Sequence, residues 1–233
     1  MMTHSELIHL IDLTRLIKND TQDAVCEFCH TALTPLGPVA AVCVYPEFVT
    51  TAKEILTTTN ISVATVANFP TGQEPLLQVS NAIQKSLSDG ADEIDVVLPY
   101  HALIHGDYDY ITHFLTHCRS VTQSHVLKVI IESGALSREH IITATTLIAH
   151  CNADFVKTST GKTDIGATPE ACDAILSVLS TRLNPPGIKL SGGIQTPSQA
   201  QAYMTQIAGA MGKEWIQPKH VRIGASRLLE ALR

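Results

Sequence analysis

The sequence predicts an α/β fold in which helices cover a parallel sheet. Eight short runs rich in β-branched residues alternate with longer segments that have helical spacing. Several of these runs are apolar almost without a break, which is typical of parallel strands buried on both faces. The 233 residues suit one large domain, and no linker or low-complexity stretch divides them. We therefore predict a single (β/α)8 (TIM) barrel over residues 1–233, with a doubly wound open sheet as the structural alternative.

The predicted strands are spaced regularly along the chain. They cover residues 9–14, 39–45, 62–68, 93–99, 126–132, 154–159, 187–192 and 221–226. Each segment between them is long enough for one helix, and the helical segment 71–90 ends at Gly90, a residue that favours helix termination. Thr168 and Thr196 each precede a proline, which is the pattern of an N-cap followed by Pro at the first helical position. Residues 209–220 are only loosely patterned and predict a loop or broken helix.

Composition argues against several classes of function. The net charge of −6 and pI of about 6.0 are unfavourable for a broad basic surface, so we predict no nucleic-acid partner. No apolar run reaches the roughly 20 residues that span a bilayer, so we predict no membrane partner. The first residues show no basic stretch followed by an apolar one, as a signal peptide would. We therefore expect a cytoplasmic protein whose six cysteines are reduced thiols.

One cysteine pair matches a cofactor motif. Cys26, Cys29 and His30 form C-x-x-C-H, the pattern of covalent haem attachment. The surrounding residues 21–33 have helical spacing, and no second C-x-x-C completes a zinc site. Because nothing directs export, we interpret the pair as thiols on an amphipathic helix. Cys43 has no evident partner base and the histidines are scattered, so we predict neither a metal nor a cofactor.

Ionisable side chains interrupt five of the predicted strands. They are Asp12, Asp95, Lys128, Lys157 and Lys189. Alternate side chains of a strand share a face, and the interior of a barrel brings residues from alternate strands together. Asp95 and Lys157 each lie four residues after the alanine of an Ala-Asp pair, which predicts that they share a height and a face. The alternative to a functional site is an inert network of ion pairs inside the barrel.

Lys157 is the candidate nucleophile. A free lysine has a pKa near 10.4, whereas attack on a carbonyl needs the neutral amine. Burial and a second nearby cation both lower the pKa of a lysine, and we predict that Lys189, two strands away in the interior, supplies that cation. Such an amine forms a Schiff base, and Asp95 can move the protons of that reaction through a water.

Small residues end the last three predicted strands. The stretch Gly161 to Thr163 resembles the end of a P-loop, but Val156 stands where that motif needs its first glycine, so we reject a nucleotide site. Glycine-rich loops let backbone N–H groups approach an anion, and barrels often bind phosphate after strands 7 and 8. The alternative is that each glycine serves only a tight turn. The candidate phosphate ligands are Gly161, Lys162, Gly192, Gly193, Gly224 and Ser226.

The chain resembles the deoxyribose-phosphate aldolase family from near its start to its end. The matching stretches are IDLTRL, AAVCVYPEFV, VATVANFPTG, GADEIDVVLPY, LKVIIESGAL, ADFVKTSTGK, GIKLSGGIQT and RIGASRLL, in the family's order. The family consists of metal-independent class I aldolases on TIM barrels. They cleave 2-deoxy-D-ribose 5-phosphate reversibly to acetaldehyde and D-glyceraldehyde 3-phosphate.

The resemblance implies a role for each charged residue. Lys157 matches the Schiff-base lysine, Lys189 the lysine that perturbs it, and Asp95 the aspartate of the proton relay. Lys128 and Asp12 match supporting relay positions, and the glycine-rich loops match the phosphate site. Gln195 and Arg227 depart from the family, which often has Arg and Ser at these positions. A homodimer would be unsurprising for this family.

The expected function is therefore the cleavage of deoxyribose phosphate in sugar and deoxyribonucleotide catabolism, with small phosphosugars and aldehydes as substrates. Two alternatives stay open at this point. One is another imine-forming phosphosugar lyase, or a transaldolase, which would share the lysine but not the substrate. The other is a barrel that binds a phosphosugar without turnover.

Overall fold

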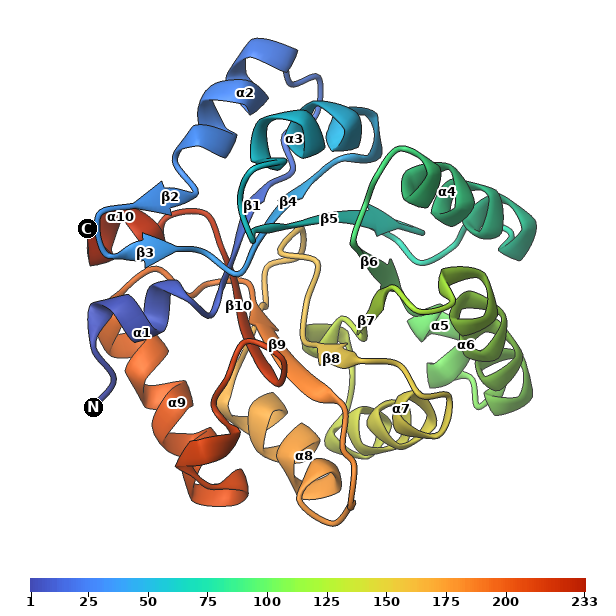
Figure 1. Cartoon of the computed structure of the whole chain (residues 1–233). Helices are drawn as coiled ribbons and strands as arrows, with labels where there is room; N and C mark the ends of the chain where they lie inside the picture. The colour runs from blue at the N-terminus through green and yellow to red at the C-terminus, as the bar shows by residue number, and fades with distance from the viewer.

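The computed structural model describes residues 1–233 and has a closed barrel of eight parallel strands at its centre (Figure 1). Neighbouring strands follow chain order, and the first strand closes the barrel by pairing with the last. The strands are β1 (Ile11–Arg15), β4 (Ala41–Val44), β5 (Ser62–Ala67), β6 (Glu93–Val97), β7 (Val126–Ile130), β8 (Phe155–Lys157), β9 (Gly187–Ser191) and β10 (Val221–Ala225). The prediction of a (β/α)8 barrel is confirmed, and the open sheet is excluded.

Helices surround the barrel and follow each strand (Figure 1). The larger ones are α2 (Gln22–His30), α3 (Val49–Leu56), α4 (Leu76–Ser88), α6 (Tyr108–Thr122), α7 (Arg138–His150), α8 (Pro169–Leu179) and α9 (Pro197–Met211). The short helices are α1 (His4–Ile8), α5 (Tyr100–Ile104) and α10 (Leu228–Leu232). Single 3-10 turns lie at Pro46–Phe48, Ser133–Ala135 and Lys213–Trp215, and a small hairpin joins β2 (Leu33–Thr34) to β3 (Gly37–Pro38).

The predicted helix caps form as expected. The Thr168 hydroxyl accepts from the backbone N–H of Ala171, and Thr196 accepts from that of Gln199, with Pro169 and Pro197 at the first helical position. The segment expected to be a helix from residue 71 begins its helix only at Leu76. In the loosely patterned segment 209–220, α9 ends at Met211 and a 3-10 turn follows.

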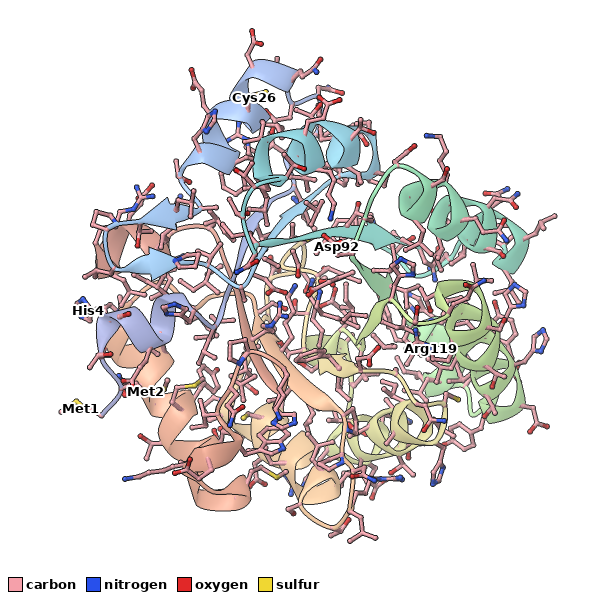
Figure 2. All side chains as sticks on the ribbon, in the orientation of Figure 1. Met1, Met2, His4, Cys26, Asp92 and Arg119 are labelled. Carbon is pink, nitrogen blue, oxygen red and sulfur yellow. The ribbon has the colours of Figure 1, made fainter.

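The hydrophobic core lies between the barrel wall and the helices. It is one contiguous cluster of buried aliphatic side chains from every strand, and α8 alone contributes Cys172, Ile175 and Leu179. Ion pairs connect the helices to the loops that lead into strands: Lys53 of α3 pairs with Asp92, and Arg119 of α6 pairs with Asp154. Asp92 and Arg119 are labelled in Figure 2. The carboxylates of Asp92 and Asp154 also accept backbone N–H groups of Val63 and Leu127 at the starts of β5 and β7. Inside the barrel, small apolar side chains such as Ala41, Cys43 and Ala64 form a separate buried cluster beside the charged residues.

No helix of this structure combines the length and the apolar character needed to cross a membrane.

Candidate active site

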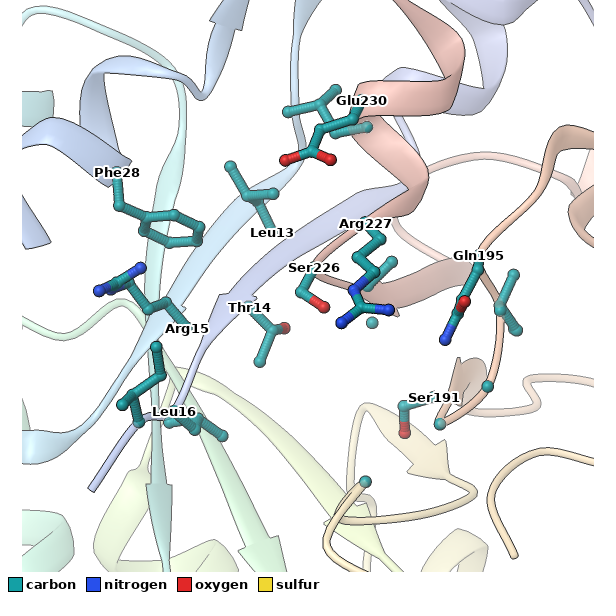
Figure 3. Close-up of a pocket in the computed structure, with 18 of the residues that line it drawn as sticks. Leu13, Thr14, Arg15, Leu16, Phe28, Ser191, Gln195, Ser226, Arg227 and Glu230 are labelled. Carbon is teal, nitrogen blue, oxygen red and sulfur yellow. The ribbon is translucent and has the colours of Figure 1, made fainter. Parts of the chain in front are cut away.

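A cavity of about 670 Å³ opens at the carboxyl ends of the barrel strands (Figure 3). Loops after β1, β8, β9 and β10 form its walls, and α2 and α10 close it on one side. Lys157 is the only lysine of the buried interior that reaches this cavity, because Lys128 and Lys189 lie deeper. The carboxyl end of a parallel barrel is where reactive groups of such folds gather.

The predicted charged residues converge beneath the cavity. Asp95 on β6 is fully buried, and its Oδ2 accepts hydrogen bonds from Lys157 Nζ and Lys189 Nζ, both at 2.7 Å. Its Oδ1 accepts from Lys128 Nζ at 2.8 Å. Asp12 on β1 lies 2.5 Å from Lys189 Nζ and 3.5 Å from Lys128 Nζ. The sequence-based prediction that these side chains point inward together is confirmed.

The relative position of Lys157 and Lys189 differs from the prediction. Lys157 and Lys189 lie on adjacent strands, β8 and β9, and are direct register partners, rather than lying two strands apart. Asp95 and Lys157 do share the inward face. However, Asp95 is in register with Lys128 on β7, and Lys128 is in register with Phe155 on β8. Phe155 lies two positions before Lys157. Strands of a closed barrel are tilted, and this tilt brings residues with such an offset to one level.

Two members of the cluster were missed in the sequence. Glu93 begins β6 and lies 2.5 Å from Lys128 Nζ. Arg222 on β10 donates to Asp12 Oδ1 at 2.6 Å and to Glu93 Oε1 at 3.0 Å. Alternation from Asp95 back to Glu93 indicates that both point inward. Arg222 lies near the start of its strand, where a charge is usually solvated, so the sequence alone does not mark it as an interior charge.

The cluster has more cations than anions. Four basic side chains, Arg222 and the three lysines, face the three carboxylates of Asp12, Glu93 and Asp95. Lys128 lies within 4 Å of all three carboxylates, and Lys189 within 4 Å of two. Asp95 is the only carboxylate that Lys157 contacts, and Lys157 shares its Oδ2 with Lys189. A surplus charge is costly inside a protein, and Lys157 is the group that loses a proton most readily.

The pKa shifts follow from these contacts. Burial, followed by the nearby Lys189 cation, lowers the pKa of Lys157 despite the opposing effect of Asp95. Burial also opposes the charge of Lys189, but Asp12 and Asp95 outweigh it and raise the pKa of that lysine. Burial disfavours the Asp95 anion as well, yet the three lysines hold the pKa of Asp95 well below its ordinary value. The site therefore combines an amine with a lowered pKa, Lys157, with a carboxylate whose pKa is also lowered, Asp95.

The predicted phosphate ligands all line the same cavity: Gly161, Lys162, Gly192, Gly193, Gly224 and Ser226. The backbone N–H groups of Gly192, Gly193, Ser226 and Arg227 donate no hydrogen bond within the protein. Gly193 has a φ of +87° and open space where a side chain would stand, so its backbone is accessible. Such unpaired N–H groups beside a cavity suit an anion.

Arg227 lies at the rim of the cavity, between Ser226 and Gln195 (Figure 3). The other cations of the rim have partners within the protein. Arg15 pairs with Asp20, Lys162 Nζ donates to the Leu16 carbonyl at 2.6 Å, and Arg233 donates to the carbonyl of Thr31. Arg227 makes no hydrogen bond or ion pair through its guanidinium and so remains available to a ligand.

A buried carboxylate shapes the loop after β8. Glu132 is fully buried and has no lysine or arginine partner. Its oxygens accept from the hydroxyls of Thr160 and Thr163. Strict alternation along the chain from Lys128 predicts that Glu132 shares its face. In the structure it lies just beyond β7, in left-handed backbone with a φ of 52°, and supports the loop that carries Gly161.

None of the three cysteines considered as candidates lines the cavity. Cys43 is fully buried, and burial raises the pKa of its thiol. Cys26 lies on α2 in the outer layer (Figure 2), whereas Cys29 on the same helix is buried and burial raises its pKa to about 11. No three His, Cys, Asp or Glu side chains are arranged to hold a metal ion.

Comparison with known proteins gives a consistent result. Residues 6–229 match the family described as DeoC/LacD family aldolase. A protein from Coccidioides immitis, provisionally named deoxyribose-phosphate aldolase, is 27% identical over 98% of this chain and 86% of its own, with a TM-score of 0.87. A protein from Toxoplasma gondii with the same provisional name is 24% identical over 99% and 94% of the two chains, with a TM-score of 0.89. The tetrameric deoxyribose phosphate aldolase of Aeropyrum pernix is 24% identical over 98% and 91%, with a TM-score of 0.76. The last two likenesses concern the fold alone.

Proposed function

Since the chain belongs to the DeoC/LacD aldolase family, we propose that it cleaves 2-deoxy-D-ribose 5-phosphate reversibly to acetaldehyde and D-glyceraldehyde 3-phosphate. The observation that carries this proposal is the buried Lys157 amine, which lies at the base of an open cavity and has a lowered pKa. It is the group best suited to attack an aldehyde. The expected role is the catabolism of deoxyribose phosphate.

The proposed reaction begins with the neutral amine of Lys157. Its lone pair attacks the C1 aldehyde of the open-chain sugar, and the resulting carbinolamine loses water to give a protonated imine. A base then removes the proton of the C3 hydroxyl, and the electrons of the C2–C3 bond move into the imine. This step releases D-glyceraldehyde 3-phosphate and leaves an enamine on Lys157. Protonation at C2 and hydrolysis release acetaldehyde and restore the amine.

Asp95 is suited to the proton transfers. Its Oδ2 lies 2.7 Å from both Lys157 and Lys189, so it can pass a proton between the two nitrogens, or to a water beside them. Lys189 keeps its charge because Asp12 and Asp95 surround it. In this proposal Lys189 and Lys128 hold Asp95 in place, and Asp12 in turn holds Lys189.

The phosphate end of the substrate is proposed to bind at the opposite wall of the cavity. The free N–H groups of Gly192, Gly193 and Ser226 face this region, and the unpaired Arg227 supplies a positive charge. Gln195, also at the rim, offers an amide without a charge. Lys162 would exchange its Leu16 carbonyl for a phosphate oxygen.

Trapping of the imine tests the proposal. The protein is incubated with acetaldehyde, reduced with borohydride and digested, and the modified lysine is located by mass spectrometry. We expect an ethyl group on Lys157. The Lys157→Leu variant should yield no adduct and no cleavage, whereas Lys18→Leu, at an exposed lysine, should behave as the unaltered protein does.

The same experiment separates the alternatives. No adduct, or an adduct at another lysine, contradicts the proposed mechanism and favours a barrel that only binds its ligand. An adduct at Lys157 without release of acetaldehyde from 2-deoxy-D-ribose 5-phosphate indicates an imine-forming lyase or transaldolase with a different substrate. The predicted homodimer is tested by light scattering of the purified chain.

A further inference from the structure

Arg222 lies beneath the lysine cluster and does not reach the cavity. It is the second residue of β10 and is only 7% exposed. Besides its bonds to Asp12 and Glu93, its Nε donates to the Pro218 carbonyl, and its guanidinium lies 5.5 Å from the centre of the Phe155 ring. The guanidinium is therefore fixed on several sides.

Two chains of contacts connect Arg222 to the candidate nucleophile. The first passes through Glu93 and Lys128 to Asp95, and the second passes through Asp12 and Lys189 to the same carboxylate. Arg222 thus shares Asp12 with Lys128 and Lys189, and Glu93 with Lys128. The negative charge of a carboxylate that pairs with Arg222 is less available to stabilise the protonated form of a lysine.

The titratable and charged groups around Lys157 come from six strands. They are Asp12 on β1, Cys43 on β4, Glu93 and Asp95 on β6, Lys128 on β7, Lys189 on β9 and Arg222 on β10. Towards the mouth, Glu132 bonds to Thr160 and Thr163. Among the cations, only Arg222 cannot lose its proton under any ordinary condition. The surplus charge consequently falls on the lysines, and Lys157 has the fewest carboxylate contacts.

We propose that Arg222, acting with Glu93, is a positioning residue that keeps Lys157 in its free amine form. The inference rests on the proposed function, because it concerns the same amine. With Arg222 present, four cations face three carboxylates, and release of one proton from Lys157 balances the cluster. Without Arg222, three lysines face three carboxylates, and Lys157 stays protonated as a partner of Asp95. Loss of Glu93 has the opposite effect, because it leaves a second surplus cation.

The pH dependence of kcat/KM tests this inference. The acid limb of the profile reports the release of the proton from the nucleophile. Arg222→Gln should move that limb to higher pH by about one unit, because a buried positive charge near Lys157 is lost. Glu93→Gln should move it to lower pH by about one unit, because a buried negative charge is lost. Arg222→Lys restores the charge and should return the limb towards its original position. Arg138→Gln and Glu139→Gln make the same changes on the exposed surface and should leave the profile in place.

Opposite shifts in the two variants support the inference, and shifts of the same sign or no shift overturn it. Circular dichroism and gel filtration check that each variant is folded. Should Arg222→Gln not fold, the isosteric Glu93→Gln variant decides, because an unmoved acid limb there refutes the charge argument. Failure of the proposed function would appear separately, as an unaltered protein that forms no borohydride-trapped adduct at Lys157.

Discussion

Replacement of Asp95 by Asn tests how strongly one carboxylate organises the cluster. Asp95 accepts from Lys128 through one oxygen and from Lys157 and Lys189 through the other. The amide of Asn has one acceptor and one NH2 donor. In either orientation of the amide, its NH2 group therefore faces at least one lysine ammonium group. The variant loses a charge and gains a donor that has no acceptor.

The magnitude follows from the distances. Coulomb's law with an effective dielectric constant of about 20 gives roughly 6 kcal/mol of attraction for one pair of unit charges at 2.7 Å. Most of this is offset by the cost of removing both charges from water. Breaking a buried ion pair from one side typically costs about 3–5 kcal/mol. We expect the free energy of unfolding of Asp95→Asn to fall by that amount near pH 7.

The loss should depend on pH. Removal of the carboxylate leaves four cations facing two carboxylates, so the pKa values of the lysines in the folded variant fall below the unfolded value of about 10.4. The unfolded chain then binds more protons than the folded one, and the stability of the variant rises with pH up to about 10. Urea denaturation at pH 7 and at about pH 9.5 measures both effects. A loss below about 1 kcal/mol, or one that is equal at the two pH values, would refute the reasoning.

Three further predictions concern the surroundings of the cluster. In Gly224→Ala the new methyl group would lie 2.9 Å from Ser191 Cβ and 3.2 Å from Lys189 Cε; we expect a loss of about 1–3 kcal/mol in urea denaturation and a lower kcat, and an unchanged kcat would show that Lys189 is free to move. Arg227→Ser should lower kcat/KM for 2-deoxy-D-ribose 5-phosphate about 10- to 100-fold, the value of one charged hydrogen bond, while the values for unphosphorylated deoxyribose stay the same; an equal fall for both sugars would argue against a phosphate contact. Because the pKa of Asp95 is depressed in the folded state, its stabilising contribution is present above the unfolded value of about 3.9 and is lost as pH falls further, so urea midpoints should decline below about pH 5 and decline less in Asp95→Asn.

Most of the barrel could be predicted because parallel strands have a strong sequence signal. The run VAAVCVY is apolar throughout, since β4 is covered on both faces, and all four of its strand residues are buried. The N-caps at Thr168 and Thr196 were also predictable from the sequence, because their pattern depends only on neighbouring residues. The start of α4 at Leu76 was not, since residues 71–75 are drawn into a turn that the Asn68 side chain and backbone stabilise from outside the helix.

Only part of the charged site was predictable: the sequence indicated five of its seven charged residues, but not their arrangement. Lysines and aspartates inside apolar strands are conspicuous, and this pattern identified Asp95 and Lys157. Which carboxylate lies beside which lysine depends on strand tilt and register, which are properties of the closed barrel. Arg222 stands near the start of its strand, where a charge is usually solvated, and only the folded barrel shows that it lies inside.

The pairing of β1 with β10 has a consequence during synthesis of the protein. These strands come from opposite ends of the sequence, and Asp12 and Arg222 meet across this seam. The ribosome delivers β10 after all other strands, so a nascent chain has an open sheet edge at β1 and its lysines stand in a gap that water can enter. We expect their ammonium groups to be hydrated in that state and to have the ordinary basicity of a lysine. We therefore expect the proposed reactivity of Lys157 towards aldehydes to arise only once β10 has paired with β1 and the seam has closed.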